Sequence, residues 1–137
     1  MSTRRTVPVR AAQVASASSL ARTALGVVAL VRPSVPLAPW IGADAERGTT
    51  RLLGRALGAR DVALGIGALR ALRTDSDPAL WLVVAAGSDA ADFAATLLAW
   101  REVPALGRVA VSSATLAGAL VSVATARSLR GAPDPGP

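Results

Sequence analysis

The stretch of sequence that decides the fold runs from Asp77 to Trp100, DPALWLVVAAGSDAADFAATLLAW. Asp77 is a favourable helix N-cap and Pro78 suits the first helical position, so a helix is predicted to begin here. Trp81 and Trp100 lie 19 residues apart, which is about 29 Å along an α-helix and close to the thickness of the hydrocarbon core of a bilayer. Because indole rings favour the two membrane interfaces, the stretch predicts a membrane-spanning helix.

Three other apolar segments have the length of about 20 residues that a helix needs to cross a bilayer. Together with the stretch quoted above, they give four predicted helices at residues 12–31, 50–72, 79–100 and 106–126. The turns after the second and third helices are short, and short connections make neighbouring helices antiparallel. The sequence therefore predicts an all-α protein, an antiparallel four-helix transmembrane bundle over residues 12–130, with an N-terminal tail at 1–11 and a disordered tail at 131–137.

Composition narrows the chemistry that the chain can perform. The 137 residues fit one domain, and 52% of them are hydrophobic, with a mean hydropathy of +0.45, which excludes a disordered class. Cys and His are both absent, which excludes disulfides, thiol nucleophiles, imidazole bases and the usual zinc sites. Carboxylates, hydroxyls and guanidinium groups remain, and we expect neither a metal nor a cofactor.

The second segment has the weakest membrane signal because several charged side chains lie in it or beside it: Arg51, Arg55, Arg60, Asp61 and Arg70. It can instead be an amphipathic helix at the interface, or evidence that the whole chain is a soluble helical domain in which the two Trp residues only cap a helix. Before it, residues 32–48 contain Pro33, Pro36, Pro39 and Trp40. This spacing favours an extended path along the membrane surface, with Trp40, Trp81 and Trp100 as interface anchors.

Five ionisable side chains fall near the middle of three predicted helices: Arg22 in the first, Arg60 and Asp61 in the second, Asp89 and Asp92 in the third. Each unpaired charge at the bilayer centre costs about 2.5–3.5 kcal/mol, so five independent ones would cost roughly 12–17 kcal/mol. We therefore expect them to meet at one depth. Two arginines against three aspartates leave one excess negative charge, so at least one carboxyl is expected to carry a proton.

Small residues mark the faces through which the helices are expected to pack. Gly54, Gly58 and Gly65 share one face of the second segment with Asp61, a pattern that allows close helix approach. The fourth segment has no charge between Arg108 and Arg127. A stripe of small residues at i+4 spacing, which includes Ala114 and Gly118, predicts a wall against which the other helices pack.

Arginine counts predict the orientation. Seven arginines lie in the N-terminal tail, in the turn after the second predicted helix, and after the fourth helix, which all fall on one side of the membrane. Five arginines lie in or beside the connections on the other side. The positive-inside rule then places both termini in the cytoplasm. We expect the chain to lie in the inner (plasma) membrane. The arginines are spread along the chain and are not gathered with aromatic residues, so no nucleic-acid partner is expected.

The stretch RALGARDVALGIGAL, residues 55–69, resembles a pattern in small bacterial and fungal four-helix membrane proteins that form a domain-of-unknown-function family. Its matching residues are Arg55, Gly58, Arg60, Asp61 and Gly65, and the stretch SDAAD at residues 88–92 is similar to the acidic third helix of that family. The likeness to DoxX-like four-helix proteins is weaker. The resemblance implies the four-helix membrane topology and no activity.

Three functions are compatible with a buried polar centre of this kind. The first is a non-catalytic membrane component that uses the charged network for assembly or for binding a small lipophilic or polar ligand. The second is an enzyme whose intramembrane aspartate donates a proton to an apolar, isoprenoid-like substrate. The third is proton-coupled transport by a homo-oligomer. The lipid bilayer is the expected partner in every case.

Fractionation tests the membrane class directly. We expect the protein to remain in membranes washed with alkaline carbonate, because helices inserted in the hydrocarbon core are not released by removing surface electrostatic contacts. A known peripheral protein in the same preparation serves as the control and should be released. Recovery of the chain in the soluble fraction would end the membrane interpretation.

Overall fold

The computed structural model describes residues 9–131. Within them the chain forms five α-helices, one 3-10 helix and no strand: α1 (Val9–Val31), α2 (Ser34–Ile41), η1 (Gly42–Glu46), α3 (Gly48–Ala71), α4 (Pro78–Leu98) and α5 (Ala105–Arg130). The predicted all-α class is confirmed. Residues 9–11 of the predicted N-terminal tail belong to α1, and the predicted disordered tail lies, apart from Gly131, outside the described residues.

The four long helices occur where the sequence predicts them, with ends that differ by at most four residues. The start of α4 follows the predicted cap. The Asp77 carboxylate accepts a hydrogen bond from the backbone N–H of Ala79 at 2.9 Å, and Pro78 is the first helical residue. Local capping chemistry therefore fixes this boundary.

The prediction of an extended path over residues 32–48 is wrong, because most of this segment is helical as α2 and η1. Pro36 lies in the first turn of α2, where a missing N–H removes no helical hydrogen bond, and Pro39 lies inside the helix. Packing explains the outcome. Leu37 is buried against Gly54 of α3, and the backbone of Pro39 and Trp40 lies against Gly107 of α5. These tertiary contacts outweigh the local preference of the prolines.

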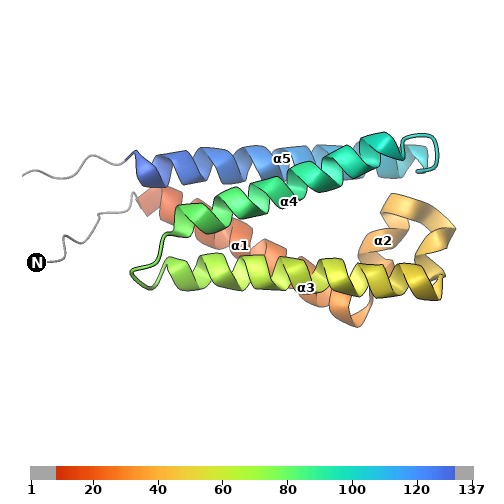
Figure 1. Ribbon diagram of the computed structural model, residues 1–137, viewed down its shortest axis with the longest axis horizontal. Helices are drawn as coiled ribbons and strands as arrows, with labels where there is room; N and C mark the ends of the chain where they lie inside the picture. Colours follow the sequence, from red (N-terminus) through yellow and green to blue (C-terminus); the bar gives the residue numbers. More distant parts are fainter. Residues whose placement is uncertain (1–8, 132–137) are drawn as a thin grey trace, which may run out of the picture.

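The long helices pair as α1 with α3 and α4 with α5, and α3 also contacts α4 (Figure 1). Six-residue connections join α3 to α4 and α4 to α5. Figure 1 shows α2 at one end of the molecule and, at the opposite end, the start of α1 with the end of α5. At that opposite end a small core of Ala11, Ala15, Leu82, Ala126 and Leu129 joins α1, α4 and α5.

Glycines set the distance between α1 and α3. A Cβ at Gly58 would lie 2.7 Å from the carbonyl oxygen of Gly26, and a Cβ at Gly26 would lie 2.7 Å from the carbonyl oxygen of Gly58. About two helical turns further on, a Cβ at Gly65 would lie 2.6 Å from the carbonyl oxygen of Ser19. The two backbones can approach this closely only because these positions have no side chain.

The distribution of apolar side chains is opposite to that of a water-soluble domain. Among residues 9–131, ten of the fifteen buried apolar residues are alanine. Larger Val and Leu side chains are exposed along the helices, with Leu98 at 90%, Leu106 at 74% and Leu120 at 62%. Three helices, α1, α4 and α5, are long and apolar enough to cross a membrane. The fold therefore has the features of a membrane protein, with small residues inside and bulky apolar residues outside.

Substitution of Gly58 tests the helix crossing. We expect Gly58→Ala to lower the free energy of unfolding by about 1–3 kcal/mol, because the new methyl group must displace the backbone of α1. Gly87→Ala is the matched control, since a Cβ there has nothing within 4 Å, and it should stabilise the helix by about 0.5–1 kcal/mol. Thermal unfolding in detergent measures both. Equal changes for the two variants would contradict the close crossing.

Candidate functional site

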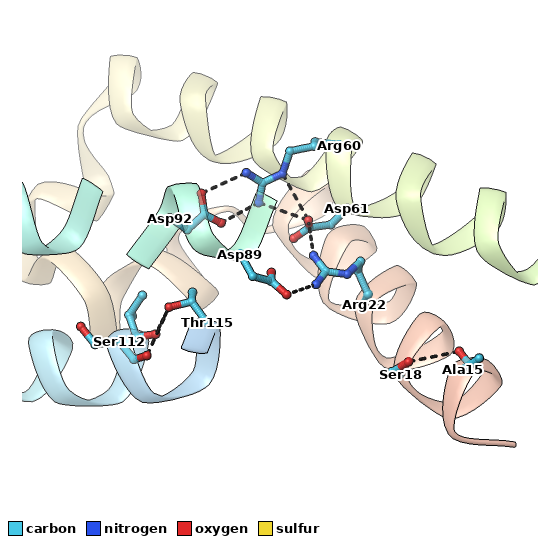
Figure 2. A network of polar contacts seen from close by, with 10 residues as sticks. Ala15, Ser18, Arg22, Arg60, Asp61, Asp89, Asp92, Ser112 and Thr115 are labelled. Atoms are coloured by element: carbon cyan, nitrogen blue, oxygen red, sulfur yellow. Dashed lines mark hydrogen bonds and ion pairs between the residues drawn. The ribbon is translucent and has the colours of Figure 1, made fainter. Parts of the chain in front are cut away.

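The charged side chains that the sequence places near mid-helix come together between three helices (Figure 2). Arg22 comes from α1, Arg60 and Asp61 come from α3, and Asp89 and Asp92 come from α4. On α4, the carboxylates at i and i+3 lie on one face and point toward α1 and α3. Helical periodicity and mid-helix position thus bring all five groups to one place.

The five side chains form one chain of ion pairs. Arg22 donates from Nη2 to Oδ2 of Asp89 at 2.5 Å and from Nη1 to Oδ1 of Asp61 at 3.1 Å. Arg60 donates to the same Asp61 Oδ1 from Nε at 3.3 Å and from Nη2 at 3.2 Å. Its Nη1 and Nη2 bind both oxygens of Asp92, at 3.0 and 2.7 Å. Asp61 therefore bridges the two arginines, and the order is Asp89, Arg22, Asp61, Arg60, Asp92.

The network is largely removed from the surface. The exposed fractions of the side chains are 9% for Asp89, 14% for Asp61, 16% for Arg22, 18% for Asp92 and 31% for Arg60. Burial makes the partners depend on one another, because loss of one leaves a buried charge without compensation.

The carboxylates are not equally satisfied. Both carboxylate oxygens of Asp92 accept hydrogen bonds from Arg60, and Asp61 accepts hydrogen bonds from two guanidinium groups. Asp89 is bound by Arg22 alone through Oδ2, and among residues 9–131 its Oδ1 accepts no hydrogen bond. Three carboxylates and two guanidinium groups leave a formal charge of −1, and Asp89 is the member with the least compensation.

The network lies in the wall of a cavity of about 590 Å³, a size in the usual range for small-molecule sites. All five α-helices contribute to the lining, and the five network residues are part of it. Between the network and the α2 end the lining is apolar, with Leu25, Leu37, Trp40, Leu57 and Val111. Toward the other end it includes the hydroxyls of Ser18, Ser19 and Ser122.

The stripe of small residues on α5 forms the wall opposite the charges. Ala114 is exposed and lines the cavity, so it is not packed against another helix there. Gly118 also lines the cavity, and a Cβ at this position would lie 2.6 Å from Oδ2 of Asp89. Gly118 therefore makes room for the carboxylate. Only the last part of the stripe, at Ala126, lies in a packed core.

The remaining predicted residues lie outside the network. Gly54, Gly58 and Gly65 are buried on α3 and contact α2 or α1. Trp81 is 37% exposed and packs over Gly67, while Trp100 is 41% exposed and its ring lies 5.5 Å from the Arg108 guanidinium. Trp40 is half-buried and lines the cavity.

Sequence reasoning missed the part of the cavity wall that α2 supplies. Pro36, Leu37 and Trp40 come from a segment interpreted as extended, and only its helical form directs them inward together. Thr115 of α5 also lines the cavity. Its hydroxyl donates to the carbonyl oxygen of Val111 at 2.8 Å, which leaves the oxygen free to accept a hydrogen bond from a ligand.

Comparison with models of protein families, with curated proteins and with solved structures finds no match to this chain. A cavity with an apolar body, a charged wall and several hydroxyl acceptors can hold a small molecule that has one polar end.

Substitution of Arg22 tests the network. We expect Arg22→Gln to lower the free energy of unfolding by about 3–5 kcal/mol, because Asp61 and Asp89 are then left with too little positive charge. The double variant Arg22→Gln, Asp89→Asn removes one charge of each sign and should recover part of the loss. Arg47→Gln is the control, since its pair with Asp44 is exposed and should contribute about 0–1 kcal/mol. Additive effects of Arg22→Gln and Asp89→Asn would argue against coupling.

Proposed function

We propose that this chain is an integral protein of the inner membrane that crosses the bilayer four times and binds a small lipophilic ligand in its central cavity. The observation on which the proposal depends is that a charged network lies in the wall of a largely apolar cavity of about 590 Å³. A network that served only to join helices would need no space beside it.

The membrane part of the proposal is supported by the surface of the helices. Val and Leu side chains are exposed on α1, α4 and α5, the three helices that are long and apolar enough to span a bilayer. In lipid this surface is solvated without cost, whereas in water it would be an extended apolar patch of the kind that leads to association. Orientation with both termini in the cytoplasm follows from the arginine bias.

A fourth crossing by α3 is supported by its length of 24 residues and by the position of its charges. Arg60 and Asp61 lie at mid-helix and are paired with α1 and α4, so they do not face lipid alone. The exposed Arg51 and Arg55 lie near the start of the helix, from where their long side chains can reach the headgroup region. The resemblance of this helix to four-helix membrane proteins of a domain-of-unknown-function family supports the same topology.

The ligand part of the proposal is supported by the composition of the lining. The lining residues of one copy of the chain come from all five α-helices. The apolar half near α2 suits a hydrocarbon body, and the network and hydroxyls suit a polar end group. A ligand of this kind would enter from the bilayer, where it partitions.

Filling the cavity tests ligand binding. We expect Ala114→Phe to abolish binding, since its side chain would occupy the cavity between the network and α2, while the fold is kept because Ala114 is not packed against a helix. Ala117→Phe, on an exposed position of the same helix that does not line the cavity, is the matched control. The measurement is mass spectrometry of small lipophilic molecules extracted from the purified proteins.

The control and the unchanged chain should carry the same bound molecule in near-stoichiometric amount, and Ala114→Phe should lack it. Equal amounts in both variants would place binding outside the cavity. An extract that contains bulk phospholipid alone in every case would contradict the proposed function.

A further inference from the structure

We propose that the ligand of the cavity is a lipophilic cation, and that its positive charge takes the place of a proton on Asp89. This inference rests on the proposed function, because it specifies the class of molecule that the cavity binds. It follows from two observations that are independent of each other: the excess negative charge of the network, and the position of the least compensated carboxylate in the cavity wall.

The first observation is the charge count. The lining holds three aspartates and two arginines, and no arrangement of the ion pairs among them reaches neutrality. An uncompensated charge in a low-dielectric interior is costly, so the site must hold one more positive charge. In the empty protein the available positive charge is a proton, and in the complex it is the ligand.

The second observation identifies the carboxylate involved. Asp89 lies in the cavity wall, its side chain is only 9% exposed, and its Oδ1 accepts no hydrogen bond within the described residues. Asp61 and Asp92 are each held by more than one guanidinium N–H. A ligand cation therefore gains most beside Asp89.

The groups around Asp89 add no further positive charge. Those that face it are Arg22 from α1, Arg60 and Asp61 from α3, and Asp92 on its own helix. The opposite wall is α5, which has no charged residue between Arg108 and Arg127, and α2 has no ionisable side chain. Titration of this site is therefore governed by the network itself.

The exchange balances in atoms and charge. The protonated Asp89 carboxyl loses its proton to water, and the carboxylate then pairs with the cationic group of the ligand, so one proton leaves for each cation that binds. A hydrocarbon body extends from this group toward Leu37, Trp40 and Val111 in the apolar half of the cavity. A neutral or anionic ligand of equal length makes the same apolar contacts but leaves the charge of the network uncompensated.

The test uses the full chain in nanodiscs of zwitterionic phosphatidylcholine, with empty nanodiscs as the blank. Three probes with the same ten-carbon chain are compared by titration calorimetry: decyltrimethylammonium, decanol and decanoate. At pH 8 we expect the cation to bind at least about tenfold more tightly than decanol, and decanoate to bind most weakly. At acidic pH the affinity for decyltrimethylammonium should fall by up to about tenfold per pH unit, because the proton and the cation compete for Asp89.

Proton release is measured by repeating the titration at acidic pH in two buffers of different ionisation enthalpy. The probe has a permanent charge and no proton to lose, so a value near one proton per bound cation must come from the protein. Asp89→Asn makes the network neutral, and it should bind the cation no more tightly than decanol and release no proton. Asp44→Asn, at an exposed ion pair in η1, is the control and should behave as the unchanged chain.

The outcomes separate the two proposals. Binding of the three probes with equal affinity, or cation binding without proton release at any pH, would overturn the inference and leave ligand binding intact. Failure of all three probes to bind would count against the proposed function as well. If Asp89→Asn does not fold, the number of protons that the unchanged chain releases per bound cation still decides whether the cation replaces a proton.

Discussion

The cost of placing charge in an apolar interior is the constraint on which this structure depends. Arg22, Arg60 and three aspartates cannot lie apart in a low-dielectric environment, and a single oxygen of Asp61 accepts hydrogen bonds from both arginines. These bonds join α1, α3 and α4 at mid-length, so they fix the axial position of each helix relative to the others. The close crossing at Gly26 and Gly58 acts with them, because it sets how near α1 and α3 can come.

The helices themselves are largely predictable from the sequence. Their lengths follow from apolar segments, and the start of α4 follows from the cap at Asp77, since both signals are local. The helical form of α2 was not predictable in the same way. Three prolines within seven residues favour an extended chain, and the contacts that reverse this preference, with Gly54 and Gly107, come from helices later in the sequence.

The same distinction applies to the candidate site. That Arg22, Asp61 and Asp89 should meet follows from energy alone, because isolated charges at that depth are too costly. The presence of a cavity beside these charges cannot be predicted from the sequence in the same way. A stripe of small residues on α5 is equally consistent with close packing, and the structure uses Ala126 for packing and Ala114 and Gly118 for space. Whether a small side chain allows contact or leaves a void depends on what stands opposite, which no single segment specifies.

The uneven composition of the network is difficult to explain by stability. Two arginines and two aspartates would join α1, α3 and α4 and reach neutrality, and an amide at position 89 could still accept a hydrogen bond from Arg22. The Asp89 carboxylate joins α4 directly to α1 through Arg22, but its charge adds a desolvation cost that an amide in the same place would not. It lies where the cavity wall offers space for a positive group and where Gly118 has no side chain to obstruct it. A network with one carboxylate more than its arginines can neutralise, held beside an accessible space, is better explained by an exchangeable partner than by the demands of folding.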